Sequence, residues 1–119
     1  MTTHQQINLI PAAVQVRVAI GASVGLRLRA LDQTGAIFDP TPYTVTAPFS
    51  NGDAATPPIA GWTVTVEGVS ILLNLSPADT ALLAPAGRST SWHWDVWLVH
   101  ATAPERMLYA HGDLGLLIP

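Results

Sequence analysis

Apolar and polar residues alternate with a period of two along most of this chain, which is the pattern of β-strands buried on one face only. The clearest example is the run 88–100, whose apolar face consists of Trp92, Trp94, Val96 and Leu98. The other face of this run consists of His93, Asp95, Trp97 and Val99. Three of the four tryptophans lie here, and a buried aromatic side chain removes about 150–250 Å² from solvent. We therefore predict that 88–100 is the central strand of the hydrophobic core.

The same alternation predicts strands within five other stretches, 6–20, 24–31, 43–49, 61–75 and 106–118. Pro11 divides the first stretch, and because proline cannot donate a ladder hydrogen bond, the piece with Ile7 and Leu9 is expected to be an edge strand or a free arm. The stretch 61–75 is predicted to be a hairpin that turns at 67–68 and places Trp62 on its inner face. One or two strands are expected in the last stretch.

A short helix is predicted between the hairpin and the central strand. Ser76 is a good N-cap, Pro77 suits the first helical position, and Asp79 lies near the positive end of the helix dipole. The helix is expected to end before Pro85. The segment 76–84 is thus predicted to cross from one strand to the next through one or two helical turns.

Seven to nine short strands with one helical crossover at about 76–84 predict an all-β fold, an antiparallel β-sandwich. A small closed barrel is the alternative. With 119 residues the chain is expected to be a single domain. Within it, residues 1–22 are expected to form an N-terminal arm and first strand, and residues 23–119 the sandwich itself.

Composition narrows the classes of function. Charged residues make up 11% of the chain, the formal net charge is -3, and all five basic residues are arginines. This composition offers no basic surface that could bind nucleic acid or an anionic membrane, so neither partner is expected. Cysteine is absent, which excludes disulfides and thiolate metal sites. Because neither a signal peptide nor a run of roughly 18 apolar residues occurs, we expect a protein that stays in the cytoplasm until it is used.

The candidates for metal binding or acid–base chemistry are two His-x-Asp pairs, His93 with Asp95 and His111 with Asp113. If the two strands that carry them were neighbours, the four side chains could form a nitrogen and oxygen metal site. The simpler interpretation, which we favour, is a set of solvent-facing polar residues with Arg27 or Arg29 as charge partners. No nucleophile elbow, phosphate loop or paired-carboxylate motif occurs, so we expect no catalytic residue, no cofactor and no metal.

Trp97 and Val99 lie on the face of the central strand that also carries polar residues. A hydrophobic patch of this kind marks a contact surface in many proteins, so the two are candidate interface residues, together with Ile7 and Leu9 of the arm. Alternatively, a second sheet, the arm or the helix covers them. A third possibility is that Trp97 or Trp62 offers a stacking surface for a sugar.

Six segments of the chain carry a resemblance to a known family: 26–35 (LRLRALDQTG), 43–47 (YTVTA), 73–81 (LNLSPADTA), 86–88 (AGR), 94–98 (WDVWL) and 112–114 (GDL). They resemble the small β-sandwich domain of tailed-bacteriophage tail, baseplate and tail-fibre proteins, and are similar to the N-terminal domain of phage baseplate upper proteins. The resemblance covers about residues 24–117. It implies a non-enzymatic, immunoglobulin-like (Ig-like) sandwich that forms homo-oligomers in the virion and docks on neighbouring virion proteins.

Two features depart from the family pattern. Baseplate upper proteins continue into a long C-terminal region, whereas this sequence stops at Pro119, so their receptor-binding part is expected to be missing. The segment 75–81 is also similar to the one before the last core strand of immunoglobulin variable domains, but the cysteine pair of those domains is absent. An Ig-like adhesive module of another origin is therefore the remaining alternative for the family.

These observations together predict a structural protein of a tailed-phage virion, namely a minor tail, tail-tip or neck component, that acts through protein–protein contacts. Its expected partners are other tail or neck proteins and copies of itself. The expected location is the virion, assembled in the host cytoplasm. The alternative function is a carbohydrate-binding or host-recognition module.

Overall fold

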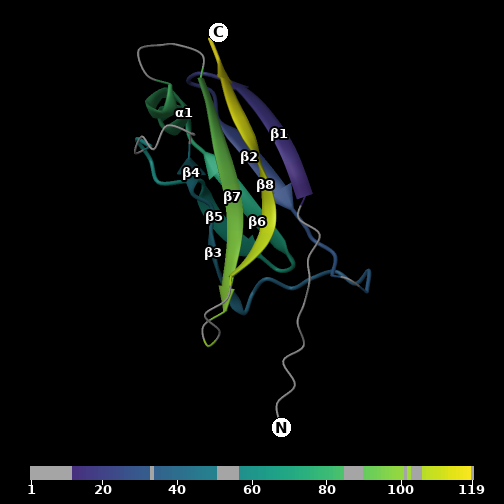
Figure 1. Ribbon diagram of the computed structural model, residues 1–119. Coiled ribbons are helices and arrows are strands. Elements are labelled where there is room, and N and C mark those ends of the chain that lie inside the picture. Colours follow the sequence, from purple (N-terminus) through teal and green to yellow (C-terminus); the bar gives the residue numbers. More distant parts are fainter. Residues whose placement is uncertain are drawn as a thin grey trace.

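The computed structural model describes residues 12–32, 34–50, 57–84, 90–100, 102 and 106–118. In these residues eight strands and one helix form two β-sheets, and Figure 1 shows how the strands of both run along one common direction. The larger sheet contains, in spatial order, β1 (Ala12–Ala19), β8 (Arg106–Leu117), β7 (Thr90–His100) and β3 (Tyr43–Thr46), with β4 (Phe49–Ser50) also paired to β7. The smaller sheet contains β2 (Val24–Leu28), β6 (Ser70–Leu75) and β5 (Thr63–Glu67).

The strand order identifies the class of sandwich. In an immunoglobulin domain the sheet C–F–G packs on the sheet B–E–D, and here β3–β7–β8 packs on β2–β6–β5. The fold is an Ig-like β-sandwich. This confirms the predicted all-β architecture and its single short helix, and the two separate sheets exclude the barrel. All strand pairs are antiparallel except β1 and β8, which run parallel.

Strands β3 and β4 pair with β7 in one continuous register, so they are two halves of one strand interrupted at Ala47 and Pro48. The proline has no N–H group for the ladder. Instead, the carbonyl of Ala47 accepts a hydrogen bond from the Trp62 backbone at 3.0 Å, and Phe49 donates to Ala60 at 3.0 Å. The interruption therefore joins the edges of the two sheets, because the segment that leads into β5 bonds to the end of β3.

The central strand is β7, as its tryptophan content predicts. Its inward side chains Trp94, Val96 and Leu98 have no exposed surface, and Trp92 is 4% exposed. Trp62, which precedes β5, is 5% exposed and packs edge-to-face on Trp94, with ring centroids 5.7 Å apart. The five residues expected to form the core are thus buried, and the aromatic pair links the two sheets.

Helix α1 (Pro77–Leu83) crosses from β6 to β7 at the end of the sandwich where β8 finishes (Figure 1). It begins with a capping box, in which the Ser76 hydroxyl accepts from the Asp79 N–H and the Asp79 carboxylate accepts from the Ser76 N–H. At the start of β7, the Trp92 indole Nε1 donates to the Leu83 carbonyl at 2.8 Å. This bond corresponds to the tyrosine corner of Ig domains, with an indole in place of the phenol.

The pairing of β7 with β8 contains a β-bulge that the alternation pattern does not reveal. Val96 is opposite Ala110 whereas Trp97 is opposite Leu108, so Tyr109 is the extra residue. Its ring is 1% exposed and its hydroxyl donates to the Leu28 carbonyl at 3.2 Å. Burial raises the pKa of Tyr109 to about 12. Because the bulge turns Tyr109 inward, it also changes which β8 residues lie next to Trp97 on the outer face.

Close packing of β1 against β8 leads to the first prediction, which concerns Gly112. A Cβ atom on Gly112 would lie 1.7 Å from the Val14 carbonyl oxygen and 3.1 Å from the Trp94 ring, whereas one on Gly115 would have its nearest neighbour at 3.6 Å. Gly112→Ala is expected to lower the free energy of unfolding by about 2 kcal/mol or more. Gly115→Ala should change it by less than about 1 kcal/mol. Urea unfolding of the two variants provides the measurement, and equal stabilities would contradict the predicted clash.

Candidate functional site

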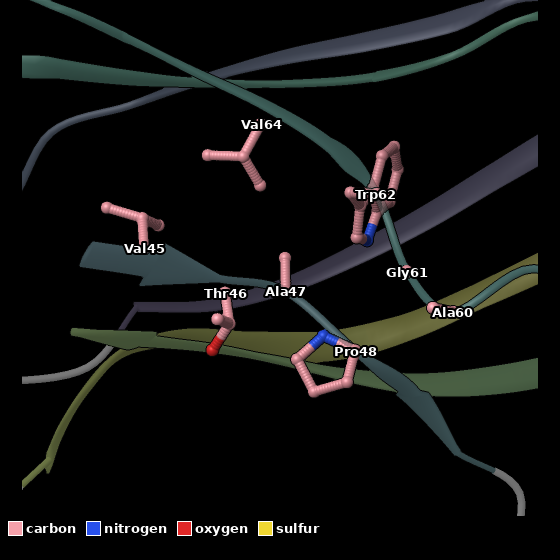
Figure 2. Close-up of a pocket in the computed structure, with 8 residues that line it drawn as sticks. All are labelled: Val45, Thr46, Ala47, Pro48, Ala60, Gly61, Trp62 and Val64. Atoms are coloured by element: carbon pink, nitrogen blue, oxygen red, sulfur yellow. The ribbon is translucent and has the colours of Figure 1, made fainter. Parts of the chain in front are cut away.

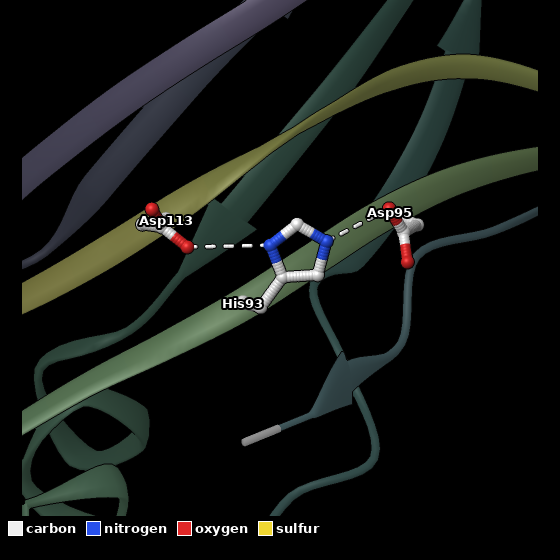
Figure 3. A network of polar contacts seen from close by, with 3 residues as sticks. All are labelled: His93, Asp95 and Asp113. Carbon is white, nitrogen blue, oxygen red and sulfur yellow. Dashed lines mark hydrogen bonds and ion pairs between the residues drawn. The ribbon is translucent and has the colours of Figure 1, made fainter. Parts of the chain in front are cut away.

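The outer face of the five-stranded sheet carries both His-x-Asp pairs of the sequence. Strands β7 and β8 are neighbours, and their register places His93 opposite Asp113 and Asp95 opposite His111. The four side chains therefore share one surface, as neighbouring strands would require. Figure 3 shows the imidazole of His93 between the two carboxylates.

The histidine forms a bridge between the two acids. Nδ1 of His93 is 3.2 Å from Oδ1 of Asp113, and Nε2 is 3.1 Å from Oδ1 of Asp95. Partial burial lowers the pKa of His93, but its hydrogen bonds to Asp113 and then Asp95, with the attraction of both charges, outweigh that effect and raise the pKa above 6.5. Both ring nitrogens donate only when the imidazole is protonated, so the bridge is complete in the cationic form.

This arrangement differs from a metal centre. A metal ion requires ligand atoms that converge on one point, whereas the two nitrogens of His93 face two different carboxylates. The ring of His111 is 6.4 Å from that of His93, centroid to centroid. Within the described part of the chain, no group of three or more His, Asp or Glu residues is placed to hold a metal ion.

The prediction that Arg27 or Arg29 is the charge partner of the outer-face residues is wrong. Arg27 makes an ion pair with Glu67 at 3.6 Å, and the Nε of Arg29 donates to the Ser70 hydroxyl at 3.3 Å. Glu67 and Ser70 belong to β5 and β6, which are strands of the other sheet. Neither arginine is therefore the partner of the outer-face aspartates, and a histidine of the same face fills that role.

Trp97 and Val99 also lie on this face, and both are partly buried. The Arg106 guanidinium lies 4.3 Å from the Trp97 ring centroid, in the position of a cation–π contact. One face of the indole is therefore covered within the chain. Trp62, the other candidate for sugar stacking, is a core residue. Ile7 and Leu9, the remaining candidate interface residues, lie outside the described residues.

The most exposed large apolar side chains are elsewhere, at the two ends of the sandwich. Leu31 and Ile37 are 53% and 51% exposed and form a single bridge in the segment that joins β2 to β3. Three others are 46–59% exposed at the opposite end: Leu82 on α1, Leu117 at the end of β8, and Ile118. None of these five residues is among the interface residues predicted from the sequence. Of the five, Leu82 could have been identified from the sequence, because it is a leucine directly beside the buried Leu83 in a helix of only two turns.

A shallow apolar groove of about 330 Å³ lies between the edges of the two sheets. Figure 2 shows that Val45 and Ala47 line it from the β3 side, and Trp62 and Val64 from the β5 side. The other lining residues are Thr46, Pro48, Ala60 and Gly61. The groove contains no ionisable group among these residues, so it offers apolar contact and no acid–base chemistry.

Comparisons with known proteins identify no family and no function for this chain. No protein-family model matches the chain, and no curated protein matches it significantly. Among solved structures it is similar to a chain from the crystal structure of the titin M10–obscurin-like 1 Ig complex, with 16% identity, a TM-score of 0.47, and 95% of each chain covered. It is also similar to a chimeric titin Z1Z2 functionalised with a KLER peptide from decorin, with 15% identity, a TM-score of 0.44, and 95% and 96% covered. The strand order described above is the basis of the Ig-like assignment.

Among the described residues, no helix is both long enough and apolar enough to cross a membrane.

The second prediction concerns the pH dependence of the His93 bridge. A histidine whose folded pKa is raised stabilises the fold fully below its unfolded pKa, and that stabilisation is lost as the pH rises through the folded pKa. Wild type is therefore expected to exceed His93→Gln in unfolding free energy by more at about pH 5.5 than at about pH 8.5. His100→Gln is the control, because His100 contacts Thr102 at the far end of β7. A difference that is constant or grows toward alkaline pH would contradict the bridge.

Proposed function

We propose that this chain is a non-enzymatic structural module that acts by protein–protein assembly, and that it serves as a minor tail, tail-tip or neck component of a tailed-phage virion. The observation that carries the assembly role is the exposure of large apolar side chains at both ends of the sandwich. Leu31 and Ile37 lie at one end, and Leu82, Leu117 and Ile118 at the other. Exposed apolar surface of this kind marks contact sites in many soluble proteins.

The low charge of the surface supports the same role. Only 11% of the residues are charged, so a partner can cover these ends without desolvating many ions. Three polar side chains of the outer sheet face, those of His93, Asp95 and Asp113, are already engaged with each other. Neighbours are therefore expected at the ends and edges of the sandwich, where apolar groups remain open to contact.

The virion setting rests on the sequence resemblance to phage tail and baseplate domains. It implies neighbouring tail or neck proteins and further copies of this chain as partners, and the virion as the location. A carbohydrate-binding role is the alternative, and it has less support, because Trp62 is buried and Arg106 covers one face of Trp97.

Incorporation into particles is the test of this function. The chain is expected to be a fixed-ratio component of gradient-purified virions of the phage or prophage that encodes it, measured by quantitative mass spectrometry. Removing the exposed anchors at one end, in the double variant Leu31→Ser with Ile37→Ser, is expected to reduce incorporation on the order of fivefold or more. Both residues are more than half exposed, so the fold should remain stable.

The control is Thr44→Ser, which changes an exposed residue on the outer face of β3. It should be incorporated like wild type. Absence of the chain from purified particles would overturn the virion role. Equal incorporation of wild type and the double variant would show that this end is not a contact surface.

A further inference from the structure

The edge of β5 that faces away from β6 has no ladder partner among the described residues. We propose that β5 forms an antiparallel pair with β5 of a second copy of this chain, around a twofold axis at Thr65, and so joins two three-stranded sheets into one of six strands. The proposal deepens the assembly function by naming the partner of one surface. Three observations carry it: a weakly protected edge, a self-complementary sequence, and an apolar groove that the second copy would cover.

The edge of β5 has little of the protection that keeps sheet edges from pairing, with one charged residue at its end. Natural sheets protect their edges with charges, prolines or bulges, because an open edge pairs readily with another strand. Of the edges of the larger sheet, β1 contains Arg17, and the edge formed by β3 and β4 is interrupted by Pro48. Strand β5 has neither proline nor bulge, and Glu67 at its end, its single charged residue, is paired with Arg27. Among the described residues its ladder partner is β6 alone.

The sequence of β5 matches its own antiparallel copy. The strand reads Thr63-Val64-Thr65-Val66-Glu67. With the axis at Thr65, each Val64 is opposite a Val66, each Thr63 is opposite a Glu67, and the two copies of Thr65 face each other. Pairs of threonines and of β-branched residues are favourable directly opposite each other in antiparallel sheets. An interface of this kind, which uses the same patch on both copies, is isologous and closes as a dimer.

The apolar groove provides the driving force. Strand β5 is the edge of the smaller sheet that lies next to β3, and the inward side chains of the two edges, such as Val45 and Val64, are only partly buried. They line the groove of about 330 Å³ between the sheets (Figure 2). A fourth strand beside β5 would extend the smaller sheet across the opening of this groove. The partner copy's Val64 and Val66, which alternate to the inner side of the strand, would then cover this apolar surface.

Five-residue edges bury less surface than a standard interface of about 1,200–2,000 Å². We therefore expect a dimer in equilibrium with monomer, whose mass measured by light scattering rises with concentration. Two lysine substitutions on the exposed outer side of the strand test the register. Thr65→Lys places two like charges directly opposite each other, and the dimer dissociation constant should rise on the order of fivefold. Thr63→Lys places each lysine opposite a Glu67, and dimerisation should be kept or strengthened.

Cross-linking gives a second readout that does not depend on charge. The chain has no cysteine, so Thr65→Cys supplies a single thiol that faces its copy across the axis. Directly opposite residues of an antiparallel pair lie within reach of a disulfide. Mild oxidation should produce covalent dimers of Thr65→Cys much faster than of Thr44→Cys, which places the thiol on the exposed face of the other sheet.

Wild type that remains monomeric at every concentration would overturn the proposal, and so would equal weakening by the two lysine variants or equal cross-linking of the two cysteine variants. Circular dichroism of each variant confirms that the sandwich is intact before the comparison is made. Virion incorporation is measured independently, so failure of self-pairing and failure of the proposed assembly function give different results.

Discussion

The contact between Trp62 and Trp94 holds the two sheets of this domain together. Ig domains of antibodies use a disulfide between sheets for this purpose, and this chain has no cysteine. Here an indole that leads into β5 packs edge-to-face on an indole of β7 at 5.7 Å, and Phe49 extends the stack to Trp62 at 5.7 Å. Both indole nitrogens are buried, and no group among the described residues accepts a hydrogen bond from either of them. A buried N–H group that stays unpaired costs about 1–3 kcal/mol. The packing must outweigh that cost, which makes a close fit around both rings essential.

Local signals in the sequence predict most of the elements. Alternation places the inward face of β7 correctly, and Ser76, Pro77 and Asp79 define the start of α1. What the sequence does not reveal are the features that depend on a distant partner. The continuity of β3 and β4 across Pro48 and the parallel pairing of β1 with β8 are set by the strands beside them, and no local pattern encodes a partner.

The same distinction between local signals and distant partners applies to the candidate site. The shared face of His93 and Asp113 follows from alternation once β7 and β8 are neighbours. The surroundings of Trp97 do not follow from alternation, because the bulge at Tyr109 shifts the register and determines which β8 side chains lie beside the indole. The exposed apolar ends lie in the connections and at a helix or strand terminus, where alternation carries no information. The three-dimensional structure was therefore needed most for learning which apolar side chains are exposed on the surface and which are covered.

The parallel pairing of β1 and β8 has a mechanical consequence. Strand β1 enters the sandwich at one end, at Ala12, while β8 leaves it at the other, at Leu117, and the two lie side by side over eight paired positions. Tension applied to the chain at these two points pulls the strands past each other along their length. The load is then shared by the whole ladder at once, whereas strands peeled from one end would lose their hydrogen bonds one at a time. The domain is accordingly strong in the direction in which neighbours attached before β1 and after β8 would stretch it.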